Sequence, residues 1–211
     1  MKKMMLTVAL FVATFSAVEA QKINLGKAVS AASKGAQALA FSNEDAKKLS
    51  KESVEWMDKH NPVTDSKSAY TKRLNRLFGK HKSEDGLDLN YKVYHVVDIN
   101  AFACADGSVR VFSSLMDLMT DDELLAIIGH EIGHVKNEDT KDAIKSAYLR
   151  AAAQDAAGAA SGAVRALSDS ELGEMANAML DAKHSKKQES QADEYAYNFM
   201  KKHGYNVVAV Y

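Results

Sequence analysis

The chain has 211 residues, of which 46% are hydrophobic and 26% are charged, with a formal net charge of −1. This is an ordinary globular composition with enough length for one sizeable core. The near-neutral charge gives no indication of nucleic-acid binding. The single cysteine, Cys104, excludes a fold held by internal disulfides.

The N-terminus has the pattern of an export signal. Met1-Lys2-Lys3 is basic, residues 4–15 form a short apolar run, and Val18-Glu19-Ala20 resembles a cleavage site. Residues 1–20 are therefore predicted to be a signal peptide, and an uncleaved anchor is the alternative. No other stretch approaches 18 apolar residues, so we expect a soluble protein exported to the periplasm or cell envelope. Residues 21–41 form an N-terminal arm that is either helical or mobile.

The next segment combines two helices with a sheet. Ser42 and Asp45 resemble a capping box that starts a helix ending at His60, before Asn61-Pro62. A second helix is predicted from Asp65 to Phe78. Residues 91–97, 101–103 and 108–112 then follow a strand pattern, with a tight turn at 106–107. We expect an antiparallel meander or a pair of hairpins.

Helices dominate the rest of the chain. A short helix is predicted from Ser114 to Met119, and a capping box of Thr120 and Glu123 starts the next one. The segment 147–166 is rich in alanine and glycine and is either a helical hairpin, a flexible flap or disordered. Further helices are predicted from residues 168–169 to 180 and from 185 to 202. The fold class is therefore α+β, mainly helical, with a small antiparallel β-sheet beside the helix that follows Thr120.

That helix contains a His-Glu-x-x-His motif. His130 and His134 are four residues apart, so they project from one face of a helix and can share one metal ion. Zinc prefers imidazole nitrogen, and a catalytic zinc site has three protein ligands and one open position for water. Glu131 is placed to accept a proton from that water as the general base. The motif predicts a zinc hydrolase with one Zn²⁺ per chain.

The third ligand must come from elsewhere in the chain. Asn137 and Thr140 stand where a metzincin would have glycine and histidine, and no glutamate occurs between Glu138 and Glu171 for a thermolysin-like spacing. The remaining candidates are four glutamates at positions 171, 174, 189 and 194, together with His184. We favour Glu189, because Asp193 lies four residues further on the same helical face and is expected to orient a zinc histidine, His130. Alanines at 192 and 196 would let the two helices approach.

These residues resemble the HtpX-like zinc metallopeptidases, a gluzincin family related to the CAAX prenyl endopeptidases, and within it the exported, YggG-type envelope branch. The resemblance covers residues 65–205. It rests on residues 100–103, the turn and strand from Gly107 to Val111, the motif at 130–134, and Glu189-Ser190-Gln191-Ala192-Asp193.

The resemblance implies zinc held by His130, His134 and Glu189, with Glu131 as base and Asp193 supporting the site. It implies an edge strand that aligns peptide substrate by strand addition, made of Ser108, Val109, Arg110, Val111 and Phe112. Family members usually continue past the third-ligand helix into a segment with His-Pro and Arg. Residues 42–211 would then be a zinc metallopeptidase domain truncated at its C-terminus.

We therefore expect a zinc-dependent endopeptidase that hydrolyses unfolded or misassembled cell-envelope proteins. Its partners would be protein or peptide substrates, with peripheral association with the envelope, and nothing in the residues sets an oligomeric state. The alternative is a non-catalytic zinc-containing binding or chaperone-like module, in which His184 closes the site as a fourth ligand.

Overall fold

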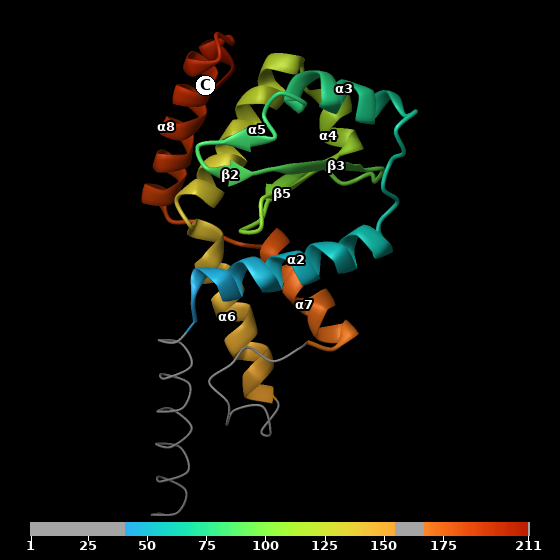
Figure 1. The fold of residues 1–211 in the computed structure, drawn as a ribbon, viewed down its shortest axis with the longest axis vertical. Coiled ribbons are helices and arrows are strands. Elements are labelled where there is room, and N and C mark those ends of the chain that lie inside the picture. The colour runs from blue at the N-terminus through green and yellow to red at the C-terminus, as the bar shows by residue number, and fades with distance from the viewer. Residues whose placement is uncertain (1–40, 155–166, 211) are drawn as a thin grey trace, which may run out of the picture.

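The computed structural model describes residues 41–154 and 167–210, in which helices surround a small sheet (Figure 1). The helices are α2 (Asn43–His60), α3 (Ala69–Phe78), α4 (Ser113–Leu118), α5 (Asp121–Lys136), α6 (Asp139–Gln154), α7 (Asp169–Leu180), α8 (Lys186–Lys202) and the short 3₁₀ helix η2 (Val207–Val210). The strands are β1 (Ser83–Glu84), β2 (Leu87–Asp88), β3 (Asn90–Tyr94), β4 (Ala101–Ala103) and β5 (Ser108–Phe112). The α+β class is confirmed.

Some expectations fall partly or wholly outside the described residues. The signal peptide at 1–20, nearly all of the arm at 21–41, and residues 155–166 of the alanine-rich segment lie there. The first part of the alanine-rich segment belongs to α6, whose helical start at Asp139 the sequence analysis did not identify.

Capping side chains set most helix starts where the sequence predicted them. Ser42 begins α2, Thr120 begins α5 and Ser168 begins α7, each in a capping box with the side chain three residues on. Ser185 caps α8 in the same way with Gln188. Each box satisfies two backbone N–H groups that a helix start otherwise leaves without a partner. The helix predicted from Asp65 begins later, after its N-cap Ser68.

The main sheet has the strand order β3-β5-β4, which differs from the expected meander. The tight turn at Gly107 is confirmed: β4 and β5 form an antiparallel pair, and the φ of Gly107 is 85°. However, β3 pairs in parallel with β5, because the connection after Tyr94 carries β4 past β5 to its far side. The sheet is therefore mixed, and β5 is its central strand. The two short strands β1 and β2 form a separate hairpin.

Helices cover both faces of this sheet, as Figure 1 shows for α3, α4 and α5 on one side and α2 on the other. Val109 and Val111 belong to a core cluster shared with α3, α5 and α8. Phe112 and Phe102 belong to a second cluster with α2 and α7 on the opposite face. This alternation explains why all five residues of β5 are buried.

A buried ion pair joins α2 to the central strand. The guanidinium of Arg110, only 2% exposed, donates from Nε and Nη2 to the two carboxylate oxygens of Asp58 at 2.8 and 2.9 Å. Lys92 and Tyr94 donate to the same carboxylate, each at 2.7 Å. Burial alone would raise the pKa of Asp58, but these hydrogen bonds outweigh it and hold the pKa at about 2.

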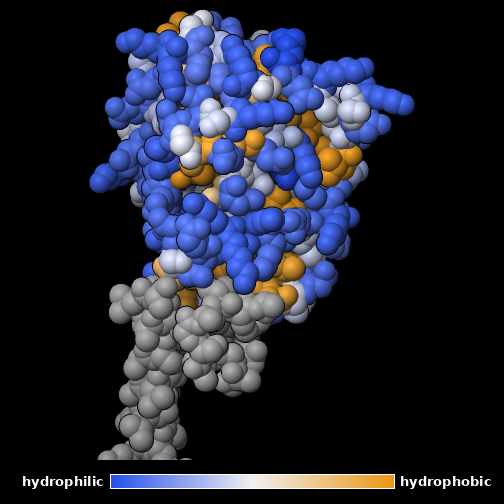
Figure 2. Space-filling model, in the orientation of Figure 1, coloured by the Kyte–Doolittle hydropathy of each residue, from blue (hydrophilic) through white to orange (hydrophobic). Residues whose placement is uncertain are grey.

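The outer surface is mostly polar. Figure 2 shows a largely hydrophilic face on which hydrophobic residues gather in separate patches. Across residues 41–154 and 167–210, none of the helices is both long enough and apolar enough to span a membrane.

Candidate metal centre

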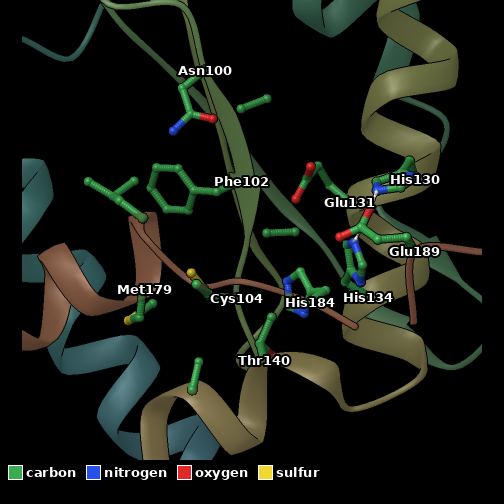
Figure 3. Close-up of a pocket in the computed structure, with 15 residues that line it drawn as sticks. Asn100, Phe102, Cys104, His130, Glu131, His134, Thr140, Met179, His184 and Glu189 are labelled. Carbon is green, nitrogen blue, oxygen red and sulfur yellow. Dashed lines mark hydrogen bonds and ion pairs between the residues drawn. The ribbon is translucent and has the colours of Figure 1, made fainter. Parts of the chain in front are cut away.

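The structure brings together the three side chains that the sequence analysis selected as metal ligands. Nε2 of His130 lies 3.0 Å from Nε2 of His134 and 3.4 Å from Oε2 of Glu189. The same glutamate oxygen is 4.0 Å from Nε2 of His134. Figure 3 shows the two imidazoles from α5 facing the carboxylate from α8. Two nitrogens and one oxygen therefore converge on one point.

Small residues at the crossing of α5 and α8 allow this convergence. A Cβ atom built on Gly133 would lie 3.1 Å from Cα and 3.2 Å from the carbonyl oxygen of Ala192. At Gly129 a Cβ would lie 3.5 Å from Cα of Ala196 and 3.1 Å from the ring of Phe199. Glycine on α5 thus packs against alanine on α8. The two helices approach closely, as the alanines predicted, and Glu189 therefore lies near the histidines.

Carboxylates fix the orientation of both imidazoles. Nδ1 of His130 lies 2.9 Å from Oδ1 of Asp193, and Nδ1 of His134 lies 2.9 Å from Oδ2 of Asp139. An ionised carboxylate only accepts hydrogen bonds, so Nδ1 of each ring is the donor to it and Nε2 is the nitrogen left to bind a metal ion. Asp193 contacts His130, as the sequence analysis expected.

This arrangement fits a bound divalent cation. The two Nε2 atoms and a carboxylate oxygen lie 3.0 to 4.0 Å from one another. A cation among them would make a favourable contact with each of the three atoms. Imidazole nitrogen combined with carboxylate oxygen, and with each imidazole held from behind by a carboxylate, is a donor set that suits zinc.

Sequence reasoning missed Asp139. It is buried at the first turn of α6, immediately after Glu138, whose φ of 62° is in the left-handed region. Residues 137–138 form a turn between α5 and α6, and this turn places the carboxylate of Asp139 2.9 Å from Nδ1 of His134. The available signal was an acidic residue at a helix start five positions after the second histidine. Its contact with His134 depends on a backbone conformation that the residue types do not indicate.

Glu131 lies in the wall of the same cavity, between β4 and the two histidines (Figure 3). Burial raises the pKa of Glu131 to about 7, a hydrogen bond from the backbone of Ala103 opposes that rise, and the charge of Glu189 adds to it. A carboxyl group with a pKa near neutrality can both take up and release a proton under physiological conditions. Its position beside the two histidines and its pKa are compatible with the general-base role predicted from the sequence.

The cavity has a volume of about 240 Å³ and lies between β4, α5, α6 and the segment before α8. His184 stacks on His134, with ring centroids 3.9 Å apart and an interplanar angle of 19°. It groups with His134 and Asp139, and His134 also belongs to the cluster with His130 and Glu189. The cavity also exposes no reactive thiol, because burial raises the pKa of Cys104 well above its ordinary value.

The prediction that residues 108–112 form an edge strand is wrong. Residues Ser108 to Phe112 form β5, which pairs with β3 on one side and with β4 on the other, so its backbone groups are not free to bind an added strand. Its side chains are buried as well. The edge beside the cavity is β4, since the segment at Pro62–Thr64 covers the outer side of β3 through hydrogen bonds to Val93 and from His95.

Comparison with known proteins agrees with this geometry. A family model described as Peptidase family M48 matches residues 71–211. The chain is 38% identical over 183 residues to Metalloprotease YcaL of Escherichia coli (strain K12), which covers 86% of this chain and 72% of that protein. It is 37% identical over 205 residues to Metalloprotease LoiP of the same strain, covering 97% of this chain and 81% of the relative.

A shorter match links the chain to a third relative. Protease HtpX of Actinobacillus pleuropneumoniae serotype 5b (strain L20) is 43% identical over 51 residues, which are 22% of this chain and 18% of that protein. The resemblance to HtpX-like metallopeptidases is thereby confirmed, and the family implies a metal cofactor. The chain belongs to peptidase family M48 and is a metalloprotease.

Proposed function

We propose that the protein is an exported zinc endopeptidase that hydrolyses unfolded or misassembled proteins of the cell envelope. The observation that carries this proposal is the cluster of His130, His134 and Glu189 beside Glu131 and an uncovered strand edge. A protein substrate is already implied by the family. The proposal goes beyond the family in three ways: the metal is zinc, the substrates are unfolded or misassembled, and the protein acts in the cell envelope.

His130, His134 and Glu189 would hold the zinc ion, and Asp193 and Asp139 would keep both imidazoles in the tautomer that presents Nε2. When bound, zinc supplies a polarising positive charge for the scissile carbonyl and lowers the pKa of a water molecule to roughly 7. Glu131 accepts the proton of the attacking water at its carboxylate and then delivers a proton to the leaving amine. Its pKa of about 7, raised by burial, suits both transfers.

The uncovered edge of β4 would hold the substrate. Cys104 donates to Ser108 and Phe112 donates to Asn100, so residues 100, 102 and 104 use their backbone groups to pair with β5. By the alternation of an antiparallel ladder, the backbone groups of Ala101 and Ala103 point away from β5, and the backbone of Ala103 donates to Glu131. An extended peptide can pair with the backbone groups of Ala101 and run past Glu131.

This mode of binding favours unfolded substrates. A peptide can add to β4 only if its own backbone N–H and C=O groups are free, and a folded protein has already paired most of them. Release of a loop or local unfolding would therefore precede cleavage of a native protein. The export signal expected at residues 1–20 supports a location in the envelope, where misassembled proteins would be the available substrates.

The test of catalysis replaces Glu131 by Gln in the full chain. Cleavage of an unfolded protein such as casein should fall by at least a thousandfold while zinc content stays at the wild-type value. Glu194→Gln, which changes an exposed carboxylate of α8, is the matched control and should cleave normally. Retained proteolysis in Glu131→Gln would refute the assigned role.

The tests of substrate state and location are separate. One protein is offered in its native form and in a permanently unfolded, reduced and alkylated form, and we expect rapid cleavage of the unfolded form only. Equal rates on both forms would contradict the preference for unfolded substrates.

Mass spectrometry of the protein recovered from the cell envelope should show a chain that begins at Gln21, whereas recovery of the whole chain in the cytoplasm would contradict export.

A further inference from the structure

A second cluster of metal-binding side chains lies outside the catalytic centre. His81, Glu84 and His203 each offer one ligand atom, and these atoms lie within 4.8 Å of one another. His81 precedes the β1–β2 hairpin, Glu84 belongs to β1, and His203 follows α8. The cluster repeats the donor set of the catalytic centre, with two imidazoles and one carboxylate, and the catalytic mechanism does not use it.

We propose that His81, Glu84 and His203 form a second, structural zinc site that fastens the end of α8 to the β1–β2 hairpin. Oε2 of Glu84 lies 3.2 Å from Nδ1 of His81 and 3.1 Å from Nε2 of His203. Ligand atoms on neighbouring corners of a zinc tetrahedron are about 3.3 Å apart, given zinc bonds of roughly 2.0–2.2 Å. Oε2 of Glu84 is thus spaced from each histidine nitrogen as one zinc ligand is from another, and all three ligand atoms lie within 4.8 Å.

One atom of this cluster has no hydrogen-bond partner. Nε2 of His203 is buried and makes no hydrogen bond, because its direction toward Glu84 does not fit one even at 3.1 Å. Buried polar atoms in folded proteins nearly always have a partner. A metal ion between His203, Glu84 and His81 would satisfy this nitrogen.

Neighbouring residues orient the other two ligands. Nε2 of His81 lies 2.7 Å from the hydroxyl of Tyr205, which can accept its proton and leave the Nδ1 lone pair for a metal. Lys202 donates to the other oxygen, Oε1, of Glu84, so Oε2 is the oxygen that faces the two histidines. Lys202 also contacts Asp85. Glu84, Asp85 and Lys202 together carry one net negative charge, which favours a cation, while Lys80 and Lys136 act on the group from further away.

The burial of the cluster indicates a structural rather than a catalytic role. The side chains of His81 and Glu84 are 1% and 4% exposed, and that of His203 is 22% exposed, which gives an ion a path to the site. The rings of Phe78, Phe199 and Tyr205 surround His81. The bound ion would hold one end of the helix whose other end carries Glu189 and Asp193. Imidazole ligands favour zinc over calcium or magnesium.

The test counts zinc ions bound to the full chain after removal of all metal with a chelator. Titration with Zn²⁺ followed by calorimetry should show two equivalents for the wild-type chain. His203→Ala should bind one. His95→Ala, which changes an exposed histidine outside both clusters, is the matched control and should still bind two. One equivalent in the wild-type chain, or two in His203→Ala, would overturn the proposal.

A second variant tests zinc binding by the second cluster without the catalytic site, and it does not require that His203→Ala folds. The double variant His130→Ala/His134→Ala removes the catalytic ligands but leaves the second cluster unchanged, so it should bind one zinc ion and no calcium. If the folded double variant binds no zinc, the proposed second site is wrong. The proposed peptidase function of the wild-type protein does not depend on that result. In that background Tyr205→Phe should weaken zinc binding about tenfold to a hundredfold, because it removes the group that orients His81.

Discussion

Two carboxylates orient the histidines of the proposed metal site, so that Nε2 of each ring is the nitrogen available to a metal ion. Asp193 holds Nδ1 of His130 and Asp139 holds Nδ1 of His134, each at 2.9 Å. The aspartate on α8 is exposed, whereas the aspartate on α6 is buried together with its histidine. A hydrogen bond screened less by water constrains its partner more strongly. Asp139, which the sequence analysis missed, is therefore expected to matter more than Asp193.

Replacing Asp139 by Asn tests this at the residue scale. The amide can still fill the space but no longer holds the tautomer of His134 by charge, so zinc affinity should fall about tenfold to a hundredfold. Competition with a chromophoric chelator measures the dissociation constant. Asp142→Asn, an exposed change one turn along α6, is the control and should leave affinity unchanged. Equal affinities of the Asp139 and Asp142 variants would show that Asp139 does not support the site.

Contacts between elements position both the sheet and the catalytic helix. The ion pair of Arg110 and Asp58 fastens α2 to β5, and the glycine-to-alanine contact of Gly133 with Ala192 fastens α8 to α5. Backbone hydrogen bonds then place β4 alongside β5, with Ala103 next to Glu131. The edge of β4, which no other strand covers among the described residues, and the carboxylate of Glu131 are thus held in fixed relation by elements that belong to the core.

The ion pair between α2 and β5 predicts a pH-dependent stability. Because the folded-state pKa of Asp58 is held at about 2, below its ordinary value of 3.8, its contribution is present above pH 4 and is lost as the pH falls toward 2. Asp58→Asn should lower the free energy of unfolding by roughly 2 kcal/mol at pH 7. Denaturant titrations of both chains should converge as the pH approaches 2.

The control for Asp58→Asn is Asp98→Asn, which changes an exposed aspartate in the loop before β4. Its stability should follow the wild-type curve at every pH. A difference between Asp58→Asn and the wild-type chain that stays constant from pH 7 to pH 2 would contradict the linkage, since it would show that the ionised carboxylate is not the source of the stabilisation.

The role of β4 predicts a loss of substrate binding when a backbone donor is removed. Proline is tolerated on an edge strand, but it has no N–H group to offer a substrate. Ala101→Pro should raise KM for an extended peptide about tenfold, the amount expected for one lost hydrogen bond of roughly 1.4 kcal/mol, and leave zinc content unchanged. Ala101→Ser keeps the N–H and should have the wild-type KM. A similar KM in both variants would exclude Ala101 from substrate alignment.

At the scale of the whole molecule, local signals were predictable and long-range pairings were not. Capping boxes at Ser42, Thr120 and Ser168 act within four residues, so the sequence placed those helix starts correctly. The four-residue spacing of His130 and His134 similarly predicted their shared face. Strand order depends on which chain segments meet in space, and both a meander and the observed sheet satisfy the alternation of residues 91–112.

The difference between local signals and long-range contacts also explains why the second cluster was not predicted from the sequence. His81, Glu84 and His203 show no recognisable spacing, and they meet only because α8 packs beside the β1–β2 hairpin. Metal ligands contributed by distant segments have no sequence signature unless one segment carries a motif. Glu189 was found because the His-Glu-x-x-His motif required a partner, and nothing in the sequence required one for His81.

This arrangement predicts how the molecule responds when metal is removed. The N-terminal part of α8 carries Glu189 and is attached to α5 by small residues that bury little apolar area, whereas α2 packs against the sheet through Val54 and Met57 and against α6 and α7 through Leu49. Loss of an ion held by His130, His134 and Glu189 removes a link between α5 and the start of α8, so residues 186–193 should open locally while α2 keeps its protection. Hydrogen–deuterium exchange of the metal-free and zinc-loaded chains measures this. Faster exchange confined to the start of α8 and the end of α5 is expected, and a uniform increase across α2 would show instead that the metal supports the whole fold.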